Sequence, residues 1–166
     1  MKKIAYPIFS CILLLFIDGW AGYKPIFGST NLQFEMADYS IEGNKILGNK
    51  IYSKLYSLSK SNKDNQNLRS VDLVIKISKV KNATAKDSAG KILQYKITLN
   101  TDVEVTDFIT KDKILNQIFI SSLIYRVQNK YSDTVNLENQ TIENLLNKIY
   151  QELVTKLAQN IITKWS

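Results

Sequence analysis

The sequence predicts an α+β domain in which two helices pack on one face of a mostly antiparallel sheet of about four strands, in the order β-α-β-β-β-α. Two observations carry this prediction. Apolar and polar residues alternate from Ile92 to Asp107, and two other segments carry apolar residues at helical spacing. At 166 residues the chain has the length of one domain and can bury a core of its own.

The alternating stretch from Ile92 to Asp107 is the clearest strand of the chain. From Leu93 to Val105 the odd positions read Leu, Tyr, Ile, Leu, Thr, Val and Val, and the even positions are all polar or charged. Because successive strand side chains point to opposite faces, one face of this strand is apolar and the other polar. The apolar face needs a cover, and the polar face must meet water or a polar partner.

Three further segments have the pattern of strands. Residues 31–41 contain Leu32, Phe34 and Met36 at every second position, and residues 71–78 alternate between apolar and polar side chains. The second of these pairs with the strand from Ile92 as a hairpin, with its turn at 88–90. Residues 114–127 are apolar on both faces. That indicates either a strand with partners on both sides or a surface meant for another protein.

Two segments have the spacing of amphipathic helices. The first runs from Lys45 to Ser59, and its apolar stripe consists of Leu47, Ile51, Leu55 and Leu58. The second runs from Leu137 to Ile162, with Asn136 as its N-cap. At 1.5 Å per residue the second helix is about 40 Å long, which is enough to cover the apolar face of the sheet.

The composition argues against an enzyme. The chain contains no His and a single Cys, Cys11. An internal disulfide, a Cys/His metal site and a His-based catalytic triad are therefore all excluded. We expect no catalytic residues, no metal and no cofactor.

The first residues predict export. An apolar run of about fourteen residues, from Ile4 to Ile17, is short for a membrane span and typical of a signal-peptide core. Gly19 and Ala21 are small residues at the spacing of a cleavage site. We expect a signal peptide or an uncleaved anchor at 1–21, a lead-in arm at 22–30 and one α+β domain at 31–166.

Positive charge is in excess, with 22 Lys and Arg against 15 Asp and Glu. Such an excess attracts anionic partners. Nucleic acid, phospholipid and lipopolysaccharide all qualify, and a Lys-rich coding bias is the alternative. The densest group surrounds the predicted hairpin turn, where Asp87 is the one carboxylate nearby in the sequence: Lys79, Lys81, Lys86 and Lys91. These lysines either bind phosphates as point charges or form an ordinary solvated strand edge.

The segment from Gly22 to Gly28, GYKPIFG, resembles the mature N-terminus of the LptE family of envelope lipoproteins. That family commonly reads Cys-Gly-(Tyr/Phe)-x-Pro-(Leu/Ile)-(Tyr/Phe)-Gly at this place. The resemblance extends in pattern over nearly the whole chain, through the strand and helix order and through Tyr95, Ser121, Ser122 and Tyr125.

The resemblance implies a non-enzymatic protein at the periplasmic side of the outer membrane that assists lipopolysaccharide assembly. Its partners would be an LptD-like β-barrel translocon, which it plugs, and lipopolysaccharide itself. The polar face of the strand from Ile92 would then face the water-filled barrel. Lys79, Lys81, Lys86 and Lys91 would contact lipopolysaccharide phosphates. One position departs from the family: Ala21 stands where its lipidated Cys belongs, so the barrel or an uncleaved leader would have to retain the protein.

Three other classes of protein compete with this interpretation. An accessory subunit of an envelope ABC transporter would share an exported α+β domain but contact an inner-membrane permease or a substrate-binding protein. An envelope hydrolase lacks support, because the sequence contains no nucleophile elbow, Gly-rich phosphate loop or obvious carboxylate pair. A nucleic-acid binder conflicts with the leader, and its aromatic residues would be interleaved with the lysines. We therefore expect no nucleic-acid partner.

Overall fold

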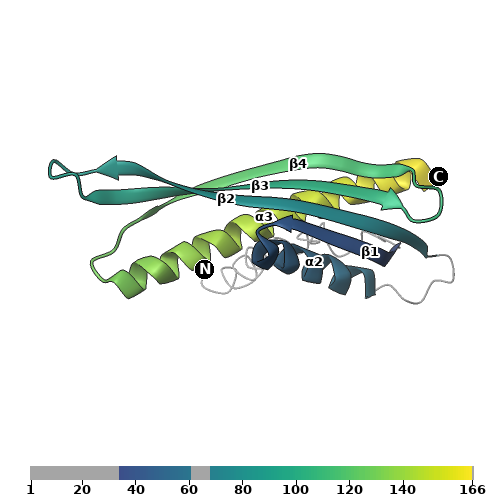
Figure 1. The fold of residues 1–166 in the computed structure, drawn as a ribbon, viewed down its shortest axis with the longest axis horizontal. Coiled ribbons are helices and arrows are strands. Elements are labelled where there is room, and N and C mark those ends of the chain that lie inside the picture. The colour runs from purple at the N-terminus through teal and green to yellow at the C-terminus, as the bar shows by residue number, and fades with distance from the viewer. Residues whose placement is uncertain (1–33, 61–67, 166) are drawn as a thin grey trace, which may run out of the picture. The chain divides into compact units, whose positions relative to one another are not determined.

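The computed structural model describes residues 34–60 and 68–165, which form one four-stranded sheet and two helices (Figure 1). The elements follow the predicted order: β1 (Phe34–Gly43), α2 (Lys45–Lys60), β2 (Arg69–Lys86), β3 (Ile92–Asp107), β4 (Lys113–Arg126) and α3 (Tyr131–Trp165). The predicted α+β class is thereby confirmed. The predicted signal peptide, the lead-in arm with GYKPIFG and the first residues of the predicted first strand lie outside the described residues.

The strands lie in the order β1-β2-β3-β4, with β1 and β4 at the two edges. β1 and β2 are parallel, and the other two pairs are antiparallel. A parallel pair needs a crossover connection, and α2 lies in that connection. β2 continues eight residues past Ser78, where the apolar alternation ends, because its ladder with β3 runs on to the pair of Lys86 and Ile92.

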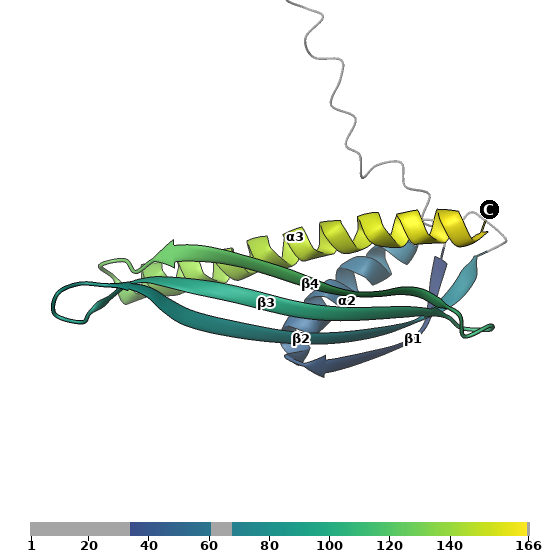
Figure 2. The same ribbon diagram turned by 90° about the horizontal axis from the view of Figure 1, so that it is seen from above.

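Both helices cover the same face of the sheet (Figure 2). The odd positions of β3 point toward them, and Ile97, Leu99 and Val103 are completely buried there. They belong to a single apolar cluster with residues of both helices, such as Ile51 and Leu145. Each fully buried aliphatic side chain of this kind contributes about 1.5 to 3 kcal/mol before conformational entropy is counted.

The predicted N-cap of the last helix is wrong. α3 begins at Tyr131, so Asn136 lies inside the helix and is exposed. The Thr134 hydroxyl accepts a hydrogen bond from the backbone N–H of Gln128 at 2.8 Å and thereby ties the first turn to the end of β4. Asp133 also lies in the first turn, where the helix dipole favours a negative charge. These polar residues extend the helix beyond its apolar stripe.

The first helix begins as its sequence indicates. The side-chain Oδ1 of Asn44 accepts a hydrogen bond from the backbone N–H of Leu47 at 3.2 Å, which is the geometry of an N-cap. Gly43 precedes it with a φ of 76°, and a Cβ at this position would lie 2.4 Å from the carbonyl oxygen of Ile77. The close approach of β1 to β2 therefore requires glycine here.

Neither α2 nor α3, over the residues that are described, contains a stretch long and apolar enough to cross a membrane.

Candidate docking face and basic hairpin end

The face of the sheet turned away from the helices is polar along β3. Its even positions from Gln94 to Thr106 are half-buried or exposed, whereas the odd positions from Ile97 to Asp107 are buried. The register sets Asn100 between Ser78 of β2 and Ile120 of β4. No described helix covers this side, which we call the open face (Figure 2).

A shallow hollow of about 350 Å³ lies in the open face and is lined by residues of all four strands. Lys76 and Glu42 meet at its edge with 3.3 Å between ammonium and carboxylate. Its lining mixes charge, amides, backbone and one large apolar side chain: Glu42, Gly43, Lys76, Ile77, Ser78, Asn100, Asp102 and Ile118. The hollow is open to solvent. It is better suited to receive a side chain of a partner than to enclose a small substrate.

β4 adds an apolar ridge to the open face. Ile118, Ile120 and Ile124 are 62%, 66% and 58% exposed. On the opposite face of the same strand, Phe119 and Tyr125 are buried against the helix layer. Of the two explanations for an apolar pattern on both faces, partners on both sides do not apply within the described residues, because the isoleucines of the open face are exposed and β4 is an edge strand. A ridge of exposed isoleucines on an edge strand is a feature of protein interfaces.

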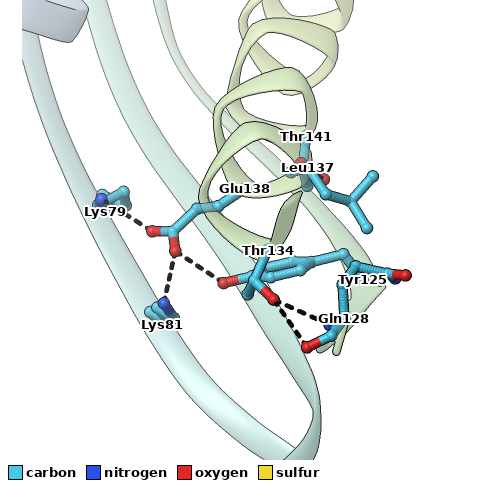
Figure 3. Close-up of polar contacts among 8 residues, drawn as sticks. All are labelled: Lys79, Lys81, Tyr125, Gln128, Thr134, Leu137, Glu138 and Thr141. Carbon is cyan, nitrogen blue, oxygen red and sulfur yellow. Dashed lines mark hydrogen bonds and ion pairs between the residues drawn. The ribbon is translucent and has the colours of Figure 1, made fainter. Parts of the chain in front are cut away.

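Two of the four predicted lysines form ion pairs within the protein. Lys79 and Lys81 lie on the helix-facing side of β2 and both meet Glu138 of α3, at 3.7 Å and 2.5 Å (Figure 3). The hydroxyl of Tyr125 donates a hydrogen bond to the same carboxylate at 2.8 Å. The Lys81 ammonium group also lies 4.2 Å from the centre of the Tyr95 ring. These contacts join β2, β3 and β4 to α3.

The partners in this cluster shift one another's pKa values. Burial alone would lower the pKa of Lys81, but its hydrogen bonds to Glu138 and Tyr125 outweigh burial and raise it. Burial alone would raise the pKa of Glu138, but hydrogen bonds from Lys81 and Tyr125 lower it below its usual range. Burial raises the pKa of Tyr125. Both members of the ion pair are therefore charged at neutral pH, and Tyr125 stays protonated.

The other two predicted lysines, Lys86 and Lys91, lie beside the β2–β3 turn. Among residues 34–60 and 68–165, their ammonium groups have no ion pair and are exposed. The Asp87 carboxylate accepts the backbone N–H groups of Ala89 and Lys91 at 2.9 Å and forms no ion pair with either ammonium group among the described residues. The turn end of the β2–β3 hairpin therefore carries exposed ammonium groups that a phosphate could bind.

Two cations that the sequence analysis did not select belong to the same end of the sheet. Lys96 of β3 pairs with Ile124 of β4, and Arg126 pairs with Gln94. Both lie on the open face and are exposed. Their place follows from strand register, which sequence spacing alone does not reveal. We define the basic hairpin end as Lys86, Lys91, Lys96 and Arg126.

Glu138 was also missed, although the sequence contains a signal for it. The apolar stripe of α3 includes Ile142, Leu145 and Ile149, at spacings of three and four. Continued one turn toward the N-terminus, the stripe reaches Glu138, so a carboxylate takes the place of an aliphatic residue. A charge in the buried stripe of a helix requires a partner of opposite charge. The lysines on the facing strand supply it.

The described part of the chain contains no candidate metal site. No three His, Cys, Asp or Glu side chains in it come together in a way that could hold a metal ion. The polar side chains of the hollow are paired with one another or half-exposed.

No family model and no curated protein matches this sequence. Solved structures do match in fold. The chain is similar to rare lipoprotein B from Shewanella oneidensis, with a TM-score of 0.53 and 11% identity over 76% of this chain and 98% of that one. It is also similar to an uncharacterized lipoprotein B from Nitrosomonas europaea, with a TM-score of 0.54 and 13% identity over 86% and 93%.

A third similar structure is a lipoprotein of unassigned function from Caulobacter crescentus, with a TM-score of 0.52 and 11% identity over 82% of this chain and 95% of that one. At such identity the likeness establishes a shared fold and nothing more. The fold defined by the sheet and its two helices is thus one that bacterial lipoproteins use.

Proposed function

We propose that this chain is a non-enzymatic protein of the bacterial envelope that assists lipopolysaccharide assembly at the periplasmic side of the outer membrane. In this role it docks its open face against a β-barrel translocon and contacts lipopolysaccharide with its basic hairpin end. The observation that carries the proposal is the open face itself, polar along β3 and ridged with exposed isoleucines along β4.

The chemistry of the open face fits a large and partly hydrated partner. Half-exposed Thr98, Asn100 and Asp102 offer hydrogen bonds to a polar wall, and Ile118 and Ile120 offer apolar area to bury. The interior of a transmembrane β-barrel is polar, and in some barrels it is filled by a plug. The shared lipoprotein fold and the LptE-like segment from Gly22 to Gly28 support the same role.

The contact with lipopolysaccharide follows from charge. Lys86, Lys91, Lys96 and Arg126 lie at one end of the sheet, with exposed Ile124 beside Lys96. A lipid phosphate next to an acyl chain presents an anion and an apolar surface at short range. Cations that border an apolar patch match that combination.

The test is affinity purification of the tagged full chain from outer membranes, followed by mass spectrometry. We expect a large β-barrel protein to co-purify with the wild type and to be lost with Ile118→Glu/Ile120→Glu. Ile46→Glu is the matched control, since Ile46 is 73% exposed on α2, away from the open face. Recovery of an inner-membrane permease or a substrate-binding protein in place of the barrel would replace this proposal with the transporter-subunit role.

A further inference from the structure

A second exposed apolar feature lies at the turn between β3 and β4, away from the basic hairpin end. Phe108 and Ile109 are neighbours in this turn and are 45% and 83% exposed. Together they place an aromatic and a branched aliphatic side chain at the tip of the sheet. Neither contributes to the open face or to the ion cluster on α3, so the features described so far do not account for them.

The turn is held rigid. The Asp107 carboxylate, buried at the base, accepts the backbone N–H groups of Ile109 and Thr110 at 2.9 Å. The N–H of Phe108 donates to the carbonyl of Ser70 at 2.9 Å, and the N–H of Lys111 donates to the carbonyl of Asp107 at 3.0 Å. A turn so restrained presents its apolar pair without a large loss of entropy on binding.

Charge does not dominate the surroundings of the turn. Each cation near it has a carboxylate close by: Arg69 with Asp107 at 3.7 Å, Lys111 with Asp72 at 2.8 Å, and Lys113 with Glu104 at 3.0 Å. Asp112 adds one more acidic group. An anionic partner would gain little here, whereas an apolar or zwitterionic one would meet no repulsion.

The position of the turn indicates which apolar partner it meets. Phe34, the first described residue, pairs with Arg69, and Val71 pairs with Asp107, so β1 begins at the same end of the sheet. The sequence before Phe34 contains the apolar run from Ile4 to Ile17. The residues between the run and Phe34 can span at most about 55 Å when extended. A lipid-inserted run would therefore limit this end of the sheet to within about 55 Å of the bilayer.

We propose that Phe108 and Ile109 insert into the interfacial region of a phospholipid bilayer. The contact is apolar and indifferent to salt. In a chain that retains the N-terminal apolar run, the contact is a second attachment, since one weak attachment alone gives only marginal membrane binding. The inference does not depend on the docking of the open face to a barrel.

The experiment places a fluorescent probe at the turn. The full chain, with Cys11→Ser, receives a single cysteine by Ile109→Cys and is labelled with an environment-sensitive dye. Vesicles of phosphatidylcholine and phosphatidylethanolamine carry a lipid-attached quencher. In vesicle-bound protein we expect the probe at 109 to be quenched and a matched probe introduced by Ser88→Cys, in the β2–β3 turn, to stay in water.

Two variants identify the contact. Phe108→Ser should reduce the ratio of immersed to free probe by about tenfold, the effect of withdrawing one large apolar side chain. Phe108→Leu should restore most of it. Ile118→Ser/Ile120→Ser should leave the quenching unchanged, which separates this contact from the open face. Unfolding in urea, compared among the variants, controls for damage to the turn.

Any of the following results would overturn the proposal: equal water exposure of the probes at 109 and 88 on bound protein, failure of the full chain to bind zwitterionic vesicles, or quenching at 109 that requires anionic lipid and disappears in high salt. Loss of quenching with Ile118→Ser/Ile120→Ser would also refute it, because adsorption would then follow exposed apolar area in general.

Discussion

The ammonium group of Lys81 on β2 lies 2.5 Å from the carboxylate of Glu138 on α3, 57 residues further along the chain. This contact connects the far part of the β2–β3 hairpin to the helix layer. It also divides the lysines of the hairpin into two kinds. Lys79 and Lys81 hold the fold together, and Lys86 and Lys91 stay available to an anionic partner.

Removing the shared carboxylate should destabilise the fold. Glu138→Gln leaves Lys81 half-buried without its ion pair, and the phenol of Tyr125 loses a charged acceptor. We expect a loss of about 2 kcal/mol in the free energy of unfolding, the range for hydrogen bonds to charged groups. Urea unfolding followed by circular dichroism measures it.

The matched control lies one turn and a half along the same helix. Glu143→Gln breaks the ion pair of Glu143 with Lys50, whose side chains are nearly half-exposed. An exposed pair of this kind contributes less than about 1 kcal/mol. Equal losses of unfolding free energy in the two variants would show that the cluster around Glu138 stabilises the fold no more than an exposed ion pair does.

Acid should weaken the fold through two carboxylates. The pKa of Glu138 is lowered, as described above, and backbone hydrogen bonds from Thr110 and Ile109 lower the pKa of Asp107 against the opposing effect of burial. Because both folded pKa values lie below the ordinary 4.5 and 3.8, the unfolded chain binds more protons in acid. Their stabilisation is complete above the ordinary values and is lost as pH falls through the folded ones.

Urea midpoints measured from neutral pH down to about pH 3 should therefore fall on acidification. The decline should be shallower in Glu138→Gln, which lacks one of the two titrating groups. A parallel decline in the wild type and the variant would assign the acid sensitivity to other carboxylates.

A buried hydroxyl offers a stabilising substitution. Thr101 on the helix-facing side of β3 is fully buried, and within the described residues its Oγ1 has no hydrogen-bond partner. Thr101→Val keeps the shape and removes the unsatisfied group, so we expect a gain of about 1 kcal/mol in the free energy of unfolding. Thr98→Val on the open face should change it by less than about 0.5 kcal/mol. Destabilisation by Thr101→Val would mean that the hydroxyl has a partner.

Lipopolysaccharide binding should depend on the free cations of the hairpin. Lys86→Glu/Lys91→Glu is expected to weaken binding about tenfold or more at low salt, at roughly 1 kcal/mol for each cation near an anionic lipid surface. Lys148→Glu/Lys156→Glu makes the same charge change on exposed positions of α3. Surface plasmon resonance on immobilised lipopolysaccharide compares the affinities of the two double variants. Equal losses of affinity would show that only the net charge of the protein matters, and not the position of the lysines. Lys79 and Lys81 are unsuitable targets because Glu138 would lose its partners.

The alternation of β3 and the apolar stripes of the two helices made most of the fold predictable. The strand from Ile92 to Asp107 has the predicted limits. In a sheet with one covered face, a strictly alternating strand can bury its apolar side chains in only one orientation. The end of β2 was not predictable in the same way. Residues 79–86 lack an apolar face of their own and are ordered by their ladder with β3.

The sequence alone determined the α+β class, the two helices on one face and the polar side of β3, because periodicity is a local property that one chain segment carries by itself. The tertiary structure decided which charges are free. Lys81 and Lys86 are the same residue type, five positions apart in one strand, and only the arrival of Glu138 from α3 distinguishes them. Coulomb interactions depend on distance in space, and the sequence specifies that distance only after the chain has folded.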